Sequence, residues 1–171
     1  MKVVLLGYMA SGKSTIGKKL AKKYSLPFLD LDDYIVSKEN KSISKIFAEN
    51  GEIYFRKIES IYLQEVLNRK DDFILSLGGG TPCYANNMSH INTSDAISIY
   101  LHAGIKTLSE RLIAKKSKRP LVAGLEDDKI FEFVGKHLFE RGFFYEQASH
   151  TIRTDGKKMA EVITEIEMLL Y

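Results

Sequence analysis

Short apolar runs alternate with longer amphipathic stretches along this chain. The first run, Val3–Leu6, holds no polar residue at all. A continuous apolar run of this kind is typical of a strand that is covered on both faces, as in a parallel sheet. Together with this first run, the predicted strands are Pro27–Leu31, Phe73–Leu77, Ile97–Leu101 and Thr151–Thr154.

Helical periodicity fills the intervals between the predicted strands. The predicted helices are Ser14–Tyr24, Asp33–Ser37, Ile43–Leu67, Ile105–Lys115, Asp128–Gln147 and Lys158–Leu170. Strands that alternate with helices predict an α/β sandwich around a largely parallel sheet. Because ligands of such folds bind at the carboxyl ends of the strands, the segments that follow the strands are the first place to search for chemistry.

Composition narrows the class of protein. The 171 residues suit one domain, and the shares of hydrophobic residues (44%) and charged residues (27%) exclude disordered, collagen-like and coiled-coil classes. The 25 basic residues exceed the 22 acidic ones only slightly, which argues against a dedicated nucleic-acid binder. No apolar run is long enough to span a bilayer, and the single cysteine, Cys83, excludes an intramolecular disulfide. We therefore expect a cytoplasmic protein without a membrane partner.

A glycine-rich loop follows the first predicted strand. Gly7–Ser14 reads Gly-Tyr-Met-Ala-Ser-Gly-Lys-Ser, which fits the pattern of a glycine, four residues and then Gly-Lys-Ser/Thr. Between a buried strand and a helix, such a loop directs backbone N–H groups at phosphates. Lys13 can then reach the β- and γ-phosphates, and the Ser14 hydroxyl can ligate Mg²⁺. The loop predicts a nucleoside triphosphate and Mg²⁺ as cofactors.

The loop leaves the base of the nucleotide open. Proteins specific for GTP usually carry an Asn-Lys-x-Asp element, and the only Asn-Lys pair here, Asn40-Lys41, lacks the acid. We therefore expect ATP.

Two aspartates close the second predicted strand. Side chains two residues apart in an extended chain project to one face, so Asp30 and Asp32 can act together. One could support Mg²⁺ through water while the other accepts a proton from an attacking hydroxyl. The structural alternative is a helix N-cap at Asp32 or Asp33, and for Asp33 we expect the cap.

Two further features admit both a functional and a structural interpretation. On the long predicted helix, Glu52, Arg56 and Glu59 have the spacing of helical neighbours. They form either a surface ion-pair ladder or an arginine that two acids orient toward an anionic substrate. The glycines Gly78–Gly80 follow the third predicted strand, where they form either a plain loop or a close approach of backbone to a ligand.

Positive charge gathers in the segment of about residues 115–128, where Pro120 and Gly124 break the helical pattern. We expect a loop or lid here, with basic side chains such as Arg119 neutralising charge on a transferring phosphate. A solvated run of charge is the alternative. On the helix that follows, Arg141 is either a second anion clamp or an ordinary helix-face arginine.

In order and spacing together, these elements resemble the shikimate kinase family over essentially the whole chain. The matching features are Gly7–Thr15, Asp30-x-Asp32, Phe47-x3-Gly51-Glu52-x2-Phe55-Arg56-x2-Glu59, Gly78–Gly80, Arg119-Pro120-Leu121, and Arg141 with Tyr145. The resemblance implies a P-loop NTPase fold, an adenylate-kinase-like three-layer α/β/α sandwich with a five-stranded parallel sheet. It also implies transfer of the γ-phosphoryl group of ATP to the 3-hydroxyl of shikimate, a step of aromatic amino-acid biosynthesis, by an enzyme expected to be a monomer.

The resemblance further implies a role for each candidate residue. Within one domain of residues 1–171, residues of about 32–60 would bind shikimate and residues of about 115–128 would form a mobile lid. Asp32 would contact the shikimate hydroxyls and act as the base, and Asp30 would support Mg²⁺ through water. The shikimate pocket would be completed by Arg56 and Arg141, which hold the carboxylate, and by a floor of Gly78, Gly79 and Gly80. ATP would be bound by Gly7, Ala10, Ser11, Gly12, Lys13, Ser14 and Thr15, with Arg111 stacking on adenine and Arg119 reaching the transferring phosphate.

The chain departs from the family pattern at two places. Ala10 stands where many members have glycine, so we expect its φ to be negative, because alanine rarely adopts a positive one. After Arg141, Phe143-Phe144 replaces the commoner Pro-Leu.

Three other functions stay open at the level of sequence. The first is a kinase of the same architecture that acts on gluconate or a nucleoside monophosphate, which a panel of acceptors would separate. The second is an ATP-binding regulatory module, which would release no ADP in response to any acceptor. The third is nucleic-acid binding through the lysines of residues 115–118, which would show a salt-dependent shift with DNA or RNA.

Overall fold

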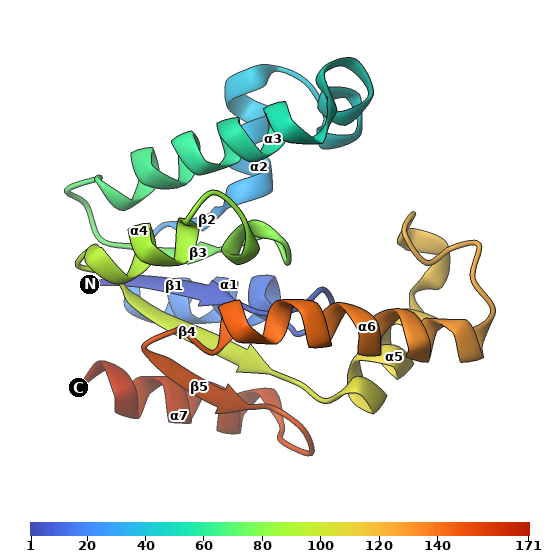
Figure 1. Cartoon of the computed structure of the whole chain (residues 1–171). Coiled ribbons are helices and arrows are strands. Elements are labelled where there is room, and N and C mark those ends of the chain that lie inside the picture. The colour runs from blue at the N-terminus through green and yellow to red at the C-terminus, as the bar shows by residue number, and fades with distance from the viewer.

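Five parallel strands form one sheet through the middle of the molecule, in the order β2-β3-β1-β4-β5 (Figure 1). The structure is a computed structural model that describes all residues 1–171. The strands are β1 (Lys2–Leu6), β2 (Phe28–Asp30), β3 (Phe73–Ser76), β4 (Ile97–His102) and β5 (His150–Arg153). All five predicted strands are confirmed, with small shifts at their ends.

Helices cover both faces of this sheet. They are α1 (Lys13–Tyr24), α2 (Leu31–Glu39), α3 (Ile43–Leu67), α4 (Asn87–Thr93), α5 (Ile105–Ala114), α6 (Asp127–Tyr145) and α7 (Met159–Leu170), with short 3-10 helices η1 (Thr81–Cys83) and η2 (Lys116–Lys118). The six predicted helices are present. Helix α4 was not predicted, because its seven residues carry only one apolar pair, Met88 and Ile91, too few for a periodic signal. None of the helices combines the length and the apolar character that crossing a membrane requires.

The alternation of side chains along β1 divides the core into two clusters. Val3 and Leu5 pack with residues of α1 and α7 on one face, whereas Val4 and Leu6 belong to the larger cluster on the other face. Successive side chains of a strand point to opposite faces, so an apolar run without polar interruptions is what a sheet covered on both sides needs. The three-layer α/β/α sandwich is thereby confirmed.

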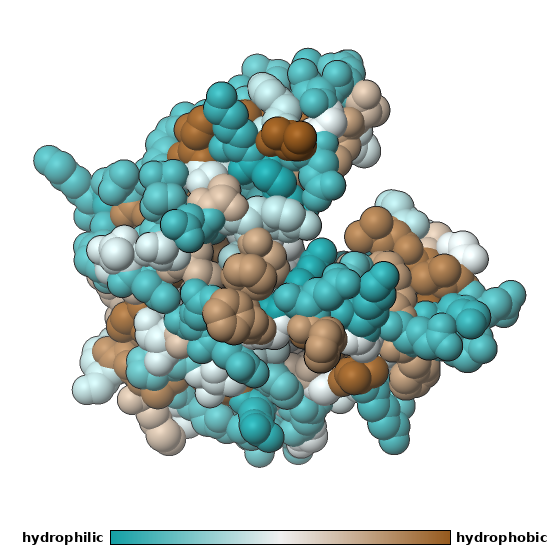
Figure 2. Space-filling view, viewed as in Figure 1, coloured by the Kyte–Doolittle hydropathy of each residue, from teal (hydrophilic) through white to brown (hydrophobic).

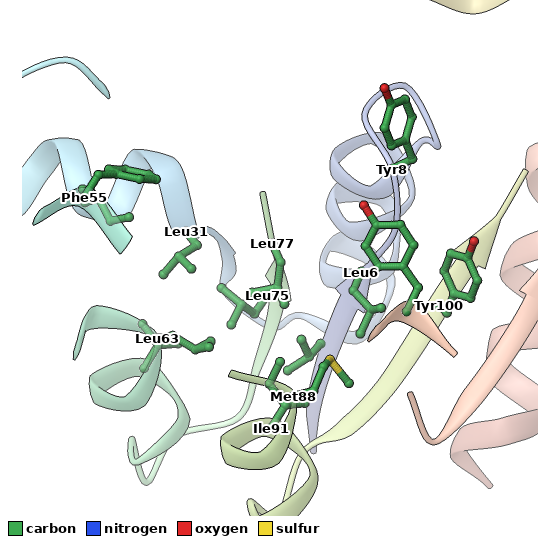
Figure 3. Close-up of a cluster of buried hydrophobic side chains, with 14 of the residues drawn as sticks. Leu6, Tyr8, Leu31, Phe55, Leu63, Leu75, Leu77, Met88, Ile91 and Tyr100 are labelled. Atoms are coloured by element: carbon green, nitrogen blue, oxygen red, sulfur yellow. The ribbon is translucent and has the colours of Figure 1, made fainter. Parts of the chain in front are cut away.

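The larger cluster fixes α2 and α3, the helices that contain the candidate residues Asp32 and Arg56. Figure 3 shows Leu31 of α2 and Phe55 and Leu63 of α3 in the same buried cluster as Leu75 of β3 and Ile91 of α4. All five side chains are buried. Burying a side chain of this size contributes about 1.5–3 kcal/mol, so the cluster holds α2 and α3 firmly against the sheet.

Helix α3 is bent at one glycine. Gly51 has φ 82° and ψ 175°, inside what the sequence predicts as one helix over Ile43–Leu67. The bounds of that prediction are confirmed, but this backbone conformation is accessible essentially to glycine alone and interrupts the helix. Phe47 and Phe55 lie on either side of the bend, and the centres of their rings are 4.5 Å apart. This contact keeps the two halves of α3 packed together.

The strand order brings three segments to the same edge of the sheet. Because β2, β3 and β1 are neighbours and parallel, Asp30, the loop Gly78–Gly80 and the loop Gly7–Gly12 all lie at their carboxyl ends. Figure 2 shows a hollow at this end of the molecule, between the lobe that contains α2 and α3 and the projecting segment that precedes α6. The fold therefore gathers segments far apart in the sequence around one opening.

Candidate active site

The loop between β1 and α1 has the backbone of a phosphate cradle. Gly7 has φ 145°, and a Cβ at this position would lie 2.8 Å from the carbonyl oxygen of Leu101. Gly12, with φ 94°, precedes Lys13, the first residue of α1. Both glycines are needed for this path of the chain, which ends with the N-terminus of α1 directed at the opening.

Ala10 overturns one expectation, because its φ is positive, at 65°. This value falls in the small left-handed region that residues other than glycine can enter at a cost of about 1–2 kcal/mol. The peptide is held in place from outside the loop: Arg111 of α5 donates a hydrogen bond of 3.0 Å to the Ala10 carbonyl oxygen. Arg111 thus contacts the nucleotide loop, whereas the stacking on adenine that the resemblance implies stays a prediction.

The lysine of the loop is buried and turned inward. Lys13 Nζ donates to the carbonyl oxygens of Gly7 at 2.8 Å and Tyr8 at 2.9 Å. Burial, together with the positive charge of Arg119, lowers the pKa of Lys13 to about 8. A polyphosphate in the cradle would offer this ammonium a full negative charge in place of two carbonyl dipoles, which favours the charged form.

Asp30 has two separate tasks at the end of β2. Its Oδ1 accepts hydrogen bonds from the backbone N–H groups of Asp32 at 3.0 Å and Asp33 at 3.4 Å, so Asp30 is the N-cap of α2. The prediction that Asp33 is the cap is wrong, because the extended backbone of Asp30 lets its own carboxylate reach those N–H groups. Its Oδ2 accepts a hydrogen bond of 3.3 Å from the Ser14 hydroxyl.

Ser14 and Asp30 together have the chemistry of a partial Mg²⁺ site. No group of three or more His, Cys, Asp or Glu side chains is placed to hold a metal ion by itself. Mg²⁺ usually keeps several waters and is bound through one or two protein oxygens together with the phosphates of its nucleotide. A serine hydroxyl beside a carboxylate, at the N-terminus of α1, provides that kind of partial site.

Asp32 lies across the opening from the lysine. Both residues line one cavity of about 400 Å³, together with Arg111 and Arg119. Burial raises the pKa of Asp32 to about 6, and the negative charges of Asp30 and other nearby acids add to the effect. A carboxylate with this pKa is a better proton acceptor than an ordinary aspartate, yet it is still ionised at neutral pH.

The three glycines after β3 lie directly against the other candidate residues. A Cβ added at each would lie 3.4 Å from Asp32 Oδ1 at Gly78, 3.5 Å from Arg141 Nη1 at Gly79 and 2.8 Å from Arg56 Nη2 at Gly80. The side chains of one carboxylate and two guanidinium groups therefore meet along one strip of bare backbone. Any larger residue at these positions would push into that space, which explains the run of glycines better than a plain loop does.

Arg56 is held by a buried acid. Its Nη1 donates a hydrogen bond of 2.9 Å to Glu59 Oε1, whereas its Nε lies 3.7 Å from Glu52 Oε1. The Glu59 side chain is only 1% exposed, and its Oε2 accepts a hydrogen bond of 2.7 Å from the Thr81 hydroxyl. The surface-ladder alternative therefore fails for Glu59, which connects Arg56 to the segment after the glycines.

Helix α6 approaches the same strip from the opposite side. Tyr145 donates a hydrogen bond of 2.6 Å to the Gly79 carbonyl oxygen, one turn of helix beyond Arg141. Sequence reasoning missed a second link, in which Tyr8 Oη and His137 Nδ1 lie 2.8 Å apart. The sequence gives no signal for this contact, because its partners are 129 residues apart and Tyr8 stands at one of the variable positions of the phosphate-loop motif.

The basic segment before α6 reaches the cavity through Lys115 and Arg119. It is fixed at one point, since Val122 is fully buried in the larger core cluster. Near its ends, Lys116 and Asp127 form an ion pair of 3.4 Å. Part of the segment is therefore anchored, and its role as a lid stays a prediction.

The predicted site residues do not all line one cavity. Ala10, Gly12, Ser14 and Thr15 line it with Lys13, whereas Gly7 and Ser11 do not. Arg56, Arg141 and Gly80 also lie outside the cavity lining, although they adjoin its glycine wall through the contacts described above. The site thus has a phosphate-binding half and an acceptor half, with Asp32 at their boundary.

A phosphate loop that shares one cavity with a half-buried carboxylate, on a parallel sheet of this strand order, defines a small-molecule kinase of the P-loop class. The shikimate kinase family model matches residues 9–170 of this chain. The chain belongs to the shikimate kinase family.

Individual relatives agree with the family match. A shikimate kinase of Flavobacterium psychrophilum is 49% identical over 170 residues, which cover 99% of each chain. The crystal structure of the Bacteroides thetaiotaomicron shikimate kinase superposes with a TM-score of 0.91 at 34% identity, covering 99% of this chain and 98% of the other. The Acinetobacter baumannii shikimate kinase, solved in complex with shikimate, gives a TM-score of 0.83 at 30% identity, covering 99% and 92%.

Proposed function

We propose that this chain transfers the γ-phosphoryl group of ATP to the 3-hydroxyl of shikimate, giving ADP and shikimate 3-phosphate for aromatic amino-acid biosynthesis. One observation carries the proposal: Lys13 of the phosphate loop and Asp32 of the acceptor half line the same cavity. A phosphate donor bound to the loop and an alcohol bound at Asp32 would therefore face each other. Membership of the shikimate kinase family supports the choice of acceptor.

The charges of the acceptor half match the chemistry of shikimate. Shikimate carries one carboxylate and three hydroxyls, so its site needs cations for the first and a hydrogen-bond acceptor for the second. Arg56 and Arg141 adjoin Gly80 and Gly79, and Asp32 adjoins Gly78, so both kinds of group border a single surface. A guanidinium bound to a carboxylate contributes about 1.5–3 kcal/mol per charge-assisted hydrogen bond. The solved complex of the Acinetobacter baumannii relative with shikimate supports the same acceptor.

The nucleotide half supplies position and positive charge. The N–H groups of the loop and the N-terminus of α1 receive the phosphates, and Lys13 turns from the loop carbonyls toward the β- and γ-phosphates. Ser14, supported by Asp30, would hold the Mg²⁺ that accompanies ATP, and the ion would neutralise phosphate charge.

The transfer itself exchanges one bond for another. The shikimate oxygen forms a bond to the γ-phosphorus as the bond to the oxygen bridging the β- and γ-phosphates breaks, and the electron pair of that bond leaves with ADP. Asp32 orients the hydroxyl and accepts its proton. Arg119 and Lys13, which line the same cavity, stabilise the charge on the transferring group.

We also propose that residues of about 115–128 act as a lid of one catalytic domain and that residues of about 32–60 form its acceptor segment. The support is the placement of Arg119 at the cavity while much of its segment projects from the fold (Figure 1). Closure would exclude water, which competes with shikimate for the phosphoryl group.

The proposal is tested by measuring ADP formation with Mg²⁺ and ATP in the presence and absence of shikimate. We expect ADP release that depends on shikimate, and a product heavier by one phosphoryl group. Gluconate, nucleoside monophosphates and buffer alone are the matched controls. Equal release with every acceptor, or release only with one of the controls, would reject the proposal.

A further inference from the structure

Tyr84 lies outside every motif considered above, yet it contacts the arginine of the acceptor half. The guanidinium carbon of Arg56 lies 4.0 Å from the centre of the Tyr84 ring. At this distance the cation is in contact with the electron-rich face of the ring, which attracts positive charge. Tyr84 directly follows η1, the short helix whose Thr81 binds Glu59.

The guanidinium is held on one edge and left open on another. Only Nη1 of Arg56 donates a hydrogen bond to the protein, to Glu59. Its Nε is buried and lies 3.7 Å from Glu52 Oε1, so it is closed to a ligand. Its Nη2 faces Gly80 and makes no hydrogen bond within the protein, so this is the edge that suits an incoming carboxylate.

The ring also limits how the guanidinium can move. Gly80 faces Nη2 so closely that an added Cβ would be 2.8 Å away, and Glu59 fixes Nη1. Tyr84 covers a face of the group that would otherwise be hydrated. Removing water from that face strengthens the bonds that the open edge can form with an anion.

We propose that Tyr84 is a positioning residue for the acceptor carboxylate, because it presses the Arg56 guanidinium into the orientation that presents its unpaired edge. The inference rests on the proposed function, since it takes a carboxylate as the ligand of Arg56. Tyr84 itself acts only through Arg56 and touches neither phosphate nor the reacting hydroxyl. Its effect therefore belongs to the binding of shikimate and not to the chemical step.

The side chain of Tyr84 can be changed without emptying the core. It is 37% exposed and belongs to neither core cluster. Three variants separate the contributions of its ring: Tyr84→Ala removes it, Tyr84→Phe keeps the aromatic face, and Tyr84→Leu keeps apolar cover without an aromatic face. Thermal unfolding of all three checks that the fold is intact.

In steady-state kinetics, Tyr84→Ala should raise the KM for shikimate by about 2- to 30-fold, the range of a cation–π contact of about 0.5–2 kcal/mol. The kcat and the KM for ATP should stay at wild-type values. Tyr84→Phe should keep the wild-type KM, and Tyr84→Leu, which keeps the apolar cover but not the aromatic face, should recover only part of the loss seen in Tyr84→Ala. An unchanged KM in Tyr84→Ala, or full rescue by Tyr84→Leu, would overturn the inference.

A second measurement needs no substrate. In the ligand-free protein, the Nε–H resonance of Arg56, assigned by its loss in Arg56→Lys, should carry the ring-current shift of Tyr84. The shift should persist in Tyr84→Phe and vanish in Tyr84→Ala and Tyr84→Leu. If wild-type protein failed to phosphorylate shikimate, the proposed function would fall, and this resonance would still decide whether Tyr84 orients Arg56. An Arg56 Nε–H chemical shift that is the same in the wild type and in all three variants would contradict the inference.

Discussion

The two halves of the site are built in different ways. The phosphate half is built mainly from one continuous segment, residues 7–15, whose backbone N–H groups and few side chains suit a phosphate. The acceptor half assembles single side chains from α2, α3 and α6 against the backbone of Gly78–Gly80. Local backbone geometry places the phosphate-binding groups of the first half. In the second half, the positions of the charged side chains depend on how distant helices pack. A substitution in the phosphate half should therefore abolish turnover. A substitution in the acceptor half should weaken the binding of shikimate to a degree that depends on the residue.

The largest expected effect is that of Lys13→Ala. Loss of the ammonium from the cavity removes charge that the transition state requires, so we expect kcat to fall by about 10³-fold or more. Thermal unfolding should show a folded protein, since the ammonium bonds only to carbonyl and hydroxyl oxygens of its own loop. Turnover within tenfold of wild type would break the distinction between the two halves.

At the boundary of the halves, Asp32→Asn should lower kcat by about 10² to 10⁴-fold if Asp32 accepts the proton. Asparagine keeps the size and a hydrogen-bonding oxygen but not the basicity. Steady-state kinetics with varied shikimate distinguishes the roles: a smaller loss of kcat with a raised KM would mean that Asp32 only orients the hydroxyl. Near-normal kcat and KM would remove Asp32 from the site.

In the acceptor half, Arg56→Lys should raise the KM for shikimate by about 10- to 100-fold, the equivalent of one charged hydrogen bond. Lysine keeps a positive charge beside Glu59, which avoids leaving that buried acid unpaired. The KM for ATP should not change, and Arg141→Lys is the matched variant from α6. A KM for ATP that rises in parallel with that for shikimate would show that the halves are not separable.

The pH dependence of the wild-type enzyme should reveal Asp32. Burial raises the pKa of Asp32 to about 6, so the proton acceptor is ionised above that pH and neutral below it. We expect kcat/KM to fall about tenfold per pH unit on the acid side of pH 6. In Asp32→Asn this fall should disappear. An acid limb that persists in the variant would assign the titration to another group.

The smallest expected effect belongs to Ala10→Gly. Glycine adopts the positive φ of 65° without strain, but it also loses more conformational freedom on folding. The two contributions nearly cancel, so the free energy of unfolding should change by less than about 1 kcal/mol. Nucleotide affinity, measured by calorimetry, should stay within about threefold. A large loss of affinity would mean that the alanine side chain itself shapes the phosphate half.

The sequence predicted the phosphate half more completely than the acceptor half, for a physical reason. A strand, a glycine-rich loop and a helix in succession fix their own geometry, so Lys13 and Ser14 could be placed from local pattern alone. The sign of φ at Ala10 could not be predicted in this way. The carbonyl oxygen of Ala10 accepts a hydrogen bond from Arg111, which lies on a helix far along the chain. The same holds for the cap of α2: β2 ends one residue before the predicted end and α2 begins two residues before the predicted start, so the cap is Asp30 in place of Asp33.

In the acceptor half, spacing along the helix suggested that Arg56 pairs with Glu52 and Glu59. It could not say which acid is buried, since that depends on Thr81 and on the packing of α3. Tyr84 gave no signal, because its contact with Arg56 bridges two segments that only the fold brings together. The resemblance to the family favoured the substrate-binding interpretation of Arg56 over the ion-pair ladder, but it gave neither of these contacts.

The most direct test of the central claim is a crystal structure of the protein with a non-hydrolysable ATP analogue, Mg²⁺ and shikimate. We predict the terminal phosphate beside Lys13 and the shikimate 3-hydroxyl within hydrogen-bonding distance of Asp32, with both ligands in one cleft. Shikimate bound on a surface remote from Lys13, with Asp32 and Arg56 free of ligand, would contradict the account.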